Sequence, residues 1–338
     1  MTHRGSGVDD VRWFAPNRYG TLPVPLLQDA GLGIAVEGDR PARLVVAADG
    51  ASAVAAYEYA RRHRVPLILY LWDLPPWWLG RGRPDRVFWA AGRLRRIPRL
   101  VGGYAERAGF LSRIGFVARR ALEVWTPSRA TQQDVRTHFG VEPVHLPFCF
   151  DSGQFYPRVP EPVPTDGAPI LLSVSRLVPH KNQQIILRAA ARLASPVRVH
   201  LIGRGPEAAS LCRLASELGV TLCLTETWVS DADVVGAYQA ASAVVCPSRF
   251  EGLGLTPLEG LAMRRPVLAS DIAPHREFAG AAARYFGPDD EAGLARGISA
   301  ALQDPAGSTP AADLAPMTID ACAERFRIRL ELLLMASR

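Results

Sequence analysis

The chain has 338 residues, of which 48% are hydrophobic and 21% are charged, which is the composition of an ordinary globular protein. This length allows two domains, each with its own core. The five cysteines are scattered, odd in number and contain no Cys-x-x-Cys pair. This pattern argues against a disulfide framework or a zinc site and indicates a reducing compartment.

The first 20 residues include charged side chains without an apolar core. No apolar run reaches the roughly 18 residues that a membrane span needs. We therefore expect no signal peptide, no spanning helix and a cytoplasmic protein. The net charge of +6 is uneven, because residues 1–150 hold 21 arginines against 13 acidic residues, whereas residues 151–338 hold 18 basic against 20 acidic residues. The first half is therefore expected to meet an acidic partner or surface.

Short apolar runs alternate with helical segments through the first half of the chain. We predict strands over residues 11–15, 43–47, 66–71, 123–126 and 144–146. Helices are predicted over residues 52–63, within 85–121 and over 128–138. This alternation indicates βαβ units and a mainly parallel sheet.

A proline-dense stretch, residues 157–169, separates the two halves and is predicted to be a linker. The alternation then restarts with strands over 170–174, 197–202, 220–224 and 243–246 and helices over 182–194, 206–218 and 231–241. A second linker-like stretch, residues 304–316, precedes a final helix. We therefore expect domains at 1–156 and 170–315, followed by a C-terminal helix at 316–338.

The segment 248–262 combines glycines, two carboxylates and the start of a predicted helix over 257–263. Thr256 suits the N-cap of this helix, and Pro257 suits its first position. A helix start approached by Gly252 and Gly254 predicts an anion site.

The two carboxylates of this segment, Glu251 and Glu259, would repel a phosphate, so we expect them to face hydroxyl groups instead. For Glu259 a second interpretation stays open: Thr256-x-x-Glu259 also fits a capping box.

The spacing Glu251-x7-Glu259 resembles the E-x7-E signature of the retaining family 4 glycosyltransferases, the glycosyl transferases group 1. Three further segments resemble this family, namely 170–177 with Lys181, 201–206, and 266–270 with His275–Glu277 as a strand and loop. The resemblance runs from about residue 122 to about residue 300. It implies an α/β fold of GT-B type, with two Rossmann-like domains facing across a cleft and the C-terminal helix crossing back to the first domain.

The resemblance also implies a function, namely the transfer of a hexose from a nucleotide-diphosphate sugar to a hydroxyl acceptor with retention of anomeric configuration. A donor phosphate oxygen would take the acceptor's proton, so the protein mainly positions and stabilises charge. No metal and no cofactor are expected, since no acidic cluster has metal-ligand spacing. No nucleic acid partner is expected either.

By the same resemblance, Arg176 and Lys181 bind the donor diphosphate, and each follows a predicted strand. Lys181 is the only lysine of the chain. Glu251 would contact the transferred sugar and Glu259 the ribose. The backbone N–H groups of Gly254, Leu255 and Thr256 would meet the phosphates.

Gly203-x-Gly205 lacks the third glycine of a dinucleotide fingerprint, because position 208 is alanine. We therefore expect Gly203 in a tight turn close to the nucleotide, and a dehydrogenase is disfavoured.

The chain departs from the family pattern at three places, which concern the acceptor side and the nucleobase pocket. Where the family carries a glycine pair beside the donor phosphates, this chain has only Gly20. Where the family carries a histidine before an aspartate, this chain has Trp72-Asp73. Thr227 replaces a further glycine. Asp73 is the acceptor-side candidate, although it also suits the turn before Pro75.

These departures leave a second function open, a non-catalytic nucleotide-sugar-binding subunit that needs a partner chain. Residues 78–120 hold 11 arginines interleaved with aromatic residues. Such a segment is typical of peripheral contact with an anionic membrane, here its inner face, although solvated helix faces share this composition.

Overall fold

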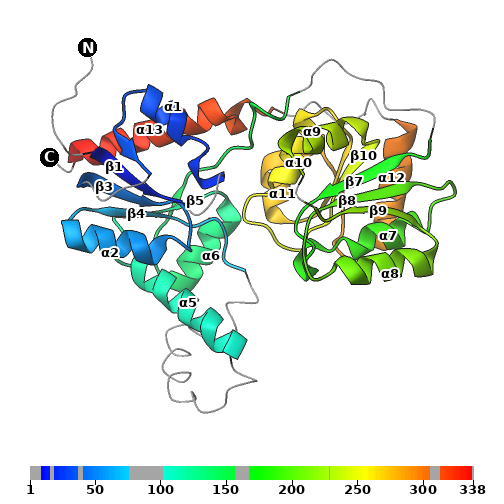
Figure 1. Cartoon of the computed structure of the whole chain (residues 1–338), viewed down its shortest axis with the longest axis horizontal. Helices are drawn as coiled ribbons and strands as arrows, with labels where there is room; N and C mark the ends of the chain where they lie inside the picture. The colour runs from blue at the N-terminus through cyan, green and yellow to red at the C-terminus, as the bar shows by residue number, and fades with distance from the viewer. Residues whose placement is uncertain are drawn as a thin grey trace. The chain divides into compact units, whose positions relative to one another are not determined.

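The computed structural model describes residues 9–15, 19–36, 41–75, 102–156, 167–227, 229–304 and 313–336. The chain divides into two compact units (Figure 1). Unit 1 comprises Met1–Phe148 and Ile319–Arg338, and unit 2 comprises Cys149–Thr318. Each unit contains a six-stranded sheet whose strand pairs are all parallel.

The sheet of unit 1 has the strand order β2-β1-β3-β4-β5-β6. Its strands are β1 (Asp9–Phe14), β2 (Ile34–Ala35), β3 (Ala42–Ala47), β4 (Leu67–Tyr70), β5 (Glu123–Thr126) and β6 (Val144–His145). All four residues of β4 are buried, as expected for a central strand of a parallel sheet that helices cover on both faces.

Helices cover both faces of this sheet. Figure 1 shows α1 and α13 on one face and α2, α5 and α6 on the other. Their bounds are α1 (Val24–Asp29), α2 (Ala53–His63), α5 (Gly102–Ala118), α6 (Arg129–Phe139) and α13 (Ile319–Ala336). The short turn η1 (Tyr19–Thr21) follows β1.

The last helix, α13, returns to unit 1, which confirms the expected crossing of the C-terminal helix. The fully buried ring of Phe326 lies 6.1 Å from Trp13, 5.7 Å from Tyr70 and 5.3 Å from Trp125, measured between ring centroids. An ion pair between Arg329 and Glu123 adds to this contact. The aromatic cluster therefore fixes α13 on the sheet of unit 1.

The sheet of unit 2 has the order β12-β11-β10-β7-β8-β9. Its strands are β7 (Ile170–Val174), β8 (Arg198–Ile202), β9 (Thr221–Thr225), β10 (Ala243–Cys246), β11 (Val267–Ser270) and β12 (Arg284–Phe286). Its helices are α7 (Gln184–Ala190), α8 (Ala208–Leu218), α9 (Asp231–Ala240), α10 (Leu255–Ala262), α11 (Ala273–Ala279) and α12 (Glu291–Gln303).

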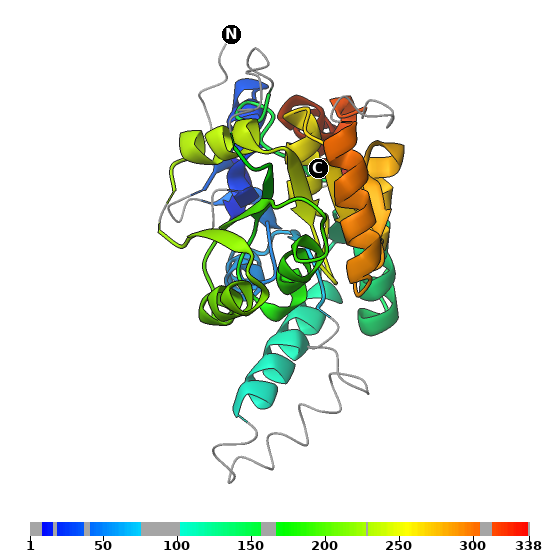
Figure 2. The same cartoon turned by 90° about the vertical axis from the view of Figure 1, so that its right-hand side faces the viewer.

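In unit 2 the helices again form two layers. Figure 1 shows α7, α8 and α12 on one face of the sheet and α9, α10 and α11 on the other, and Figure 2 shows α12 beside α7. The buried core of the first layer runs from Leu171 on β7 to Ile186 on α7 and Ile298 on α12. The parallel order brings the carboxyl ends of β7 and β10, which are neighbours, to one edge.

The unit boundary falls after Phe148 rather than at residue 156 as expected. The physical reason is that the segment 149–156 packs on unit 2, where the ring of Phe155 lies 5.5 Å from that of Tyr238. Within the expected linker, residues 157–166 lie outside the described residues. Of the basic segment 78–120, residues 78–101 also lie outside them.

Candidate functional site

The loop between β10 and α10 is fixed at its helix end by a glycine. Gly254 has a left-handed φ of 86° and is the N-cap residue of α10, which begins at Leu255. A Cβ here would lie 2.8 Å from Cδ2 of His275, so conformation and space both favour glycine. The predicted N-cap at Thr256 is wrong. Thr256 is the second helical residue, and its hydroxyl donates to the carbonyl oxygen of Val174 at 3.2 Å, which ties α10 to β7.

The first turn of α10 presents backbone N–H groups. The first N–H groups of any helix have no intrahelical acceptor. Here they belong to Gly254, Leu255 and Thr256, since Pro257, the third helical residue, has none. The positive end of the helix dipole lies at the same place, so this turn suits an anion.

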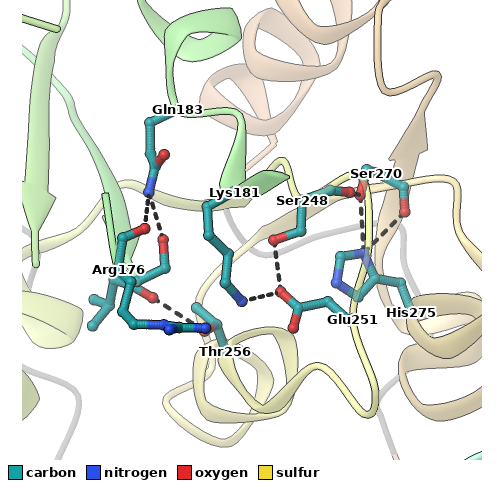
Figure 3. A network of polar contacts seen from close by, with 10 residues as sticks. Arg176, Lys181, Gln183, Ser248, Glu251, Thr256, Ser270 and His275 are labelled. Atoms are coloured by element: carbon teal, nitrogen blue, oxygen red, sulfur yellow. Dashed lines mark hydrogen bonds and ion pairs between the residues drawn. The ribbon is translucent and has the colours of Figure 1, made fainter. Parts of the chain in front are cut away.

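Lys181 and Glu251 meet in unit 2 (Figure 3). Nζ of Lys181 lies 2.5 Å from Oε1 of Glu251, and the Ser248 hydroxyl donates to the same oxygen at 2.6 Å. The Lys181 and Glu251 side chains are only 15% and 18% exposed. Burial alone would raise the pKa of Glu251, but the charge of Lys181 and the hydrogen bonds from Lys181 and Ser248 oppose it, and the pKa is lowered. Glu251 is therefore a carboxylate at neutral pH.

A buried asparagine holds Lys181 in this position. Asn182 follows the short turn η2 (Pro179–Lys181) with a left-handed φ of 56°. Its side-chain amide donates to the carbonyl oxygen of Pro247 at 3.2 Å, and its side-chain oxygen accepts from Arg249 at 2.5 Å. Both partners belong to the loop that carries Glu251, so the two site segments are joined through Asn182.

Arg176 follows the end of β7, and its side chain is exposed. Its guanidinium makes no hydrogen bond or ion pair within the part of the chain that the structure describes. Figure 3 shows this side chain reaching toward Thr256. Burial and then the charge of Lys181 lower the pKa of the neighbouring His180, and the charge of Arg176 adds to this. The site thus combines a paired lysine with an unpaired arginine.

The Gly203-x-Gly205 turn supports the segment that carries Arg176. A Cβ at Gly203 would lie 1.8 Å from the carbonyl oxygen of Ser175, and one at Gly205 would lie 2.1 Å from that of Leu177. Backbone hydrogen bonds join the two segments. Contact between two backbones therefore accounts for both glycines without any ligand.

Glu259 lies on α10 and is 6% exposed. The Tyr238 hydroxyl donates to its Oε2 at 2.7 Å. Burial raises the pKa of Glu259 to about 7, against the opposing effect of this hydrogen bond. The alternative of a capping box is wrong, because α10 is capped by Gly254 and has no side-chain cap.

His275 was expected in a loop, but it lies in α11 and is 1% exposed. Its Nδ1 lies 3.0 Å from the carbonyl oxygen of Ser270, so Nδ1 carries the proton. Nε2 is buried and has no partner among the described residues. Burial, the largest effect, lowers the pKa of His275, so the ring is neutral.

The motifs identified from the sequence contained Ser248 and His275 but gave no role to either. Asn182 and Tyr238 had no sequence signal, because their side chains reach the site from other elements. Ser248 could have been found from its spacing, three residues before Glu251 in a loop. The contact between Tyr238 and Glu259 depends on how α9 packs against α10.

Two further candidates, Gly20 and Asp73, belong to unit 1 and follow β1 and β4 of its sheet. The carbonyl oxygen of Gly20 accepts from the indole of Trp13 at 2.9 Å. Asp73 is half-buried. The preceding Trp72 donates to the carbonyl oxygen of Ala48 at 2.6 Å, so its indole is engaged within unit 1.

Within the described ranges, no helix is long and apolar enough to cross a membrane. Among the same residues, no group of three or more His, Cys, Asp or Glu side chains could hold a metal ion.

Residues 159–315 match the family model of the glycosyl transferases group 1. The match to this family thus lies within the second unit of the chain and its linker. The MMP alpha-(1->4)-mannosyltransferase of Mycolicibacterium hassiacum is 30% identical over 218 residues, which cover 62% of this chain and 49% of that protein. The GDP-mannose-dependent alpha-(1-6)-phosphatidylinositol monomannoside mannosyltransferase of Mycolicibacterium smegmatis is 29% identical, with coverages of 62% and 56%. The match therefore spans about half the length of these relatives.

Solved structures establish the fold. Anabaena HepE, in complex with UDP and glucose, superposes with a TM-score of 0.68 at 17% identity, covering 96% of this chain and 99% of that chain. Sucrose-phosphate synthase from Thermosynechococcus elongatus has a TM-score of 0.64 at 15% identity, with coverages of 96% and 95%. The chain thus has the α/β GT-B fold that was expected.

Proposed function

We propose that this chain is a retaining, metal-independent glycosyltransferase that uses a nucleotide-diphosphate sugar. The observation that carries the proposal is the pairing of Lys181 with Glu251 at 2.5 Å. A cation for phosphate and a carboxylate for sugar hydroxyl groups then share one site. The helix start at Gly254 adds N–H donors for the same diphosphate.

In the proposed reaction, the bond between the anomeric carbon and the donor phosphate oxygen breaks, and a bond from the acceptor oxygen to that carbon forms. The acceptor's proton passes to the departing diphosphate. Arg176 and Lys181 stabilise the charge that develops on this diphosphate. Glu251 orients the sugar through its hydroxyl groups, and Glu259 accepts from the ribose. The protein thus acts by position and charge rather than as a nucleophile.

Thermal unfolding in the presence of UDP, GDP, ADP and their sugars tests the donor. A bound nucleotide raises the unfolding temperature by mass action. One matched set of nucleotide and nucleotide sugar is expected to stabilise the protein. Arg176→Ala is expected to abolish most of this shift without changing the unfolding temperature of the free protein, because its guanidinium is exposed. No stabilisation by any nucleotide would overturn the proposal.

A non-catalytic nucleotide-sugar-binding subunit is the second candidate, and Trp72 favours it. Trp72 stands at the position where the family is expected to carry a histidine. Its indole N–H donates to the carbonyl oxygen of Ala48, and its ring centroid lies 4.5 Å from that of Phe148. Turnover distinguishes the two candidates. Slow donor hydrolysis or transfer supports the enzyme, and loss of it in Asp73→Asn supports Asp73 on the acceptor side. Binding without any turnover supports the subunit.

We also propose that residues 78–120 contact an anionic membrane at its inner face. Within the described part of this segment, Phe116 is 41% exposed and the Arg120 guanidinium lies 3.6 Å from its ring centroid. Sedimentation with anionic vesicles tests this contact. Binding is expected to weaken as salt rises and to fall when Arg93, Arg95, Arg96 and Arg99 are neutralised. No binding at low salt would contradict the contact.

A further inference from the structure

Tyr238 places its hydroxyl group on one oxygen of Glu259 and leaves the other available. Tyr238 lies on α9 with no exposed surface, and its hydroxyl donates to Oε2 of Glu259 at 2.7 Å. Oε1 makes no hydrogen bond within the described residues. A carboxylate held in this way can accept from ligand hydroxyl groups through Oε1.

The Tyr238 ring packs against a second aromatic ring. Phe155, which is 4% exposed, meets it edge to face at 5.5 Å with an interplanar angle of 79°. The neighbouring Gln154 donates to the carbonyl oxygen of Asp231 at the start of α9 at 3.2 Å. The segment 149–156 therefore packs against α9 and restricts the Tyr238 ring, so the hydroxyl has a defined position.

The other titratable groups near Glu259 do not stabilise its charge. Asp151, from the segment 149–156, raises the pKa of Glu259 after the larger effect of burial. The thiol of Cys246, on β10, is buried, and burial and then the charges of Glu251 and Glu259 raise its pKa. Among the described residues, no positively charged side chain is a main influence on the pKa of Glu259. Tyr238 is thus the group that favours the ionised carboxyl.

We propose that Tyr238 is a positioning residue of the donor site, whose hydroxyl holds Oε2 of Glu259 and directs Oε1 to the vicinal hydroxyl groups of a ribose. This inference rests on the proposed function. A carboxylate accepts hydrogen bonds from two hydroxyl groups, whereas a carboxylic acid must donate its own proton. Nucleotide binding should therefore require the ionised form, and a 2′-deoxynucleotide should bind more weakly because it offers one hydroxyl group fewer.

The test is calorimetric titration between pH 6 and 9. The ligand is whichever of UDP, GDP or ADP binds the wild-type protein, with inorganic pyrophosphate as the ligand without ribose. Dividing each affinity by that of Glu259→Gln at the same pH cancels the titration of the phosphates. In the wild-type protein this ratio should rise with pH around 7, where the carboxyl ionises.

In Tyr238→Phe the midpoint of this rise should lie about one pH unit higher, because the variant lacks a hydrogen bond that stabilises the ionised carboxyl. At pH 7 the nucleotide should bind roughly fivefold more weakly, because the ionised fraction of the carboxyl falls by that factor, and pyrophosphate should bind as before. Tyr285→Phe is the matched control, since its hydroxyl donates to the carbonyl oxygens of His275 and Gly280 instead. Its pH profile should be that of the wild type.

A double variant distinguishes positioning from general stability. In the Glu259→Gln background, Tyr238→Phe should cost no further nucleotide affinity, because the group through which it acts is gone. An equal loss in both backgrounds, or a pH profile of Tyr238→Phe that coincides with that of Tyr285→Phe, would overturn the inference. Failure of the wild type to bind any nucleoside diphosphate would instead overturn the proposed function.

If Tyr238→Phe does not fold, the wild-type protein still provides a test. The Tyr238 ring resonances in NMR spectra should titrate with the same midpoint as the Glu259 carboxyl, and they should stop titrating in Glu259→Gln. Ring resonances that do not respond to pH would overturn the inference.

Discussion

Nζ of Lys181 lies 2.5 Å from Oε1 of Glu251, although the two residues are 70 positions apart in the chain. Each charge neutralises the other in a site where both side chains are mostly buried. A donor diphosphate would have to share Lys181 with Glu251. The ion pair therefore holds both groups in place before a ligand arrives, which lowers the cost of ordering them on binding.

Removing Lys181 should reduce donor affinity or turnover at least tenfold. Lys181→Ala loses a charge-assisted contact to phosphate, typically about 1.5–3 kcal/mol, and leaves Glu251 buried without its cation. Calorimetry with the nucleotide, together with thermal unfolding, measures both effects. Arg188→Ala is the control, since this half-exposed cation on α7 pairs with Glu291 of α12 instead of Glu251. Equal donor affinity in the two variants would contradict the phosphate assignment.

Gly254→Ala should destabilise unit 2 more than Gly219→Ala. Both glycines have left-handed φ values, 86° and 65°, so each substitution should cost about 1–2 kcal/mol for the backbone. Only at Gly254 would the new Cβ also lie 2.8 Å from the His275 ring, whereas nothing lies within 4 Å at Gly219. Chemical denaturation measures the difference. Equal losses of stability in the two variants would show that the loop at Gly254 moves away from the His275 ring at no cost in free energy.

Glu259→Gln should stabilise the ligand-free protein at pH 8. Burial raises the pKa of Glu259 from 4.5 to about 7. The folded state therefore favours the protonated form, and this contribution is present below pH 4.5 and lost as the pH rises through 7. A neutral glutamine avoids that loss, which is on the order of 3 kcal/mol at most.

Denaturation curves at pH 5 and pH 8 measure this effect. The stabilisation by Glu259→Gln should be present at pH 8 and largely absent at pH 5. The same variant should bind nucleotide more weakly, so stability and binding should change in opposite directions. A variant less stable than the wild type at pH 8 would show that the carboxylate is favourable in the fold.

Phe326→Ala should destabilise unit 1 by about 3–5 kcal/mol, because it leaves a cavity among packed rings. Trp13, Tyr70 and Trp125 surround this side chain. Ile328→Ala, on the same helix, removes a side chain that is 48% exposed and should change the free energy of unfolding far less. Comparable losses in the two variants would contradict the role of the aromatic cluster in fixing α13.

The sequence by itself determined much of the architecture. Apolar runs such as Ala243–Cys246 predicted buried parallel strands, because only a strand covered on both faces is apolar throughout. The alternation with helices then predicted two α/β units. The sequence also predicted Lys181 and Glu251 as site residues, through the family resemblance and their places after strands, and the structure brings these two side chains together.

Other features were decided only by tertiary structure. The helix start moved from Thr256 to Gly254, because Thr256 binds the end of β7 and the left-handed glycine fits against His275. Gly203 faces backbone because β7 and β8 are neighbours. The partner of Glu259 is Tyr238, 21 positions earlier, and no local pattern specifies it. Sequence periodicity reports which face of an element is buried, but the side chain that it meets there depends on how two elements pack.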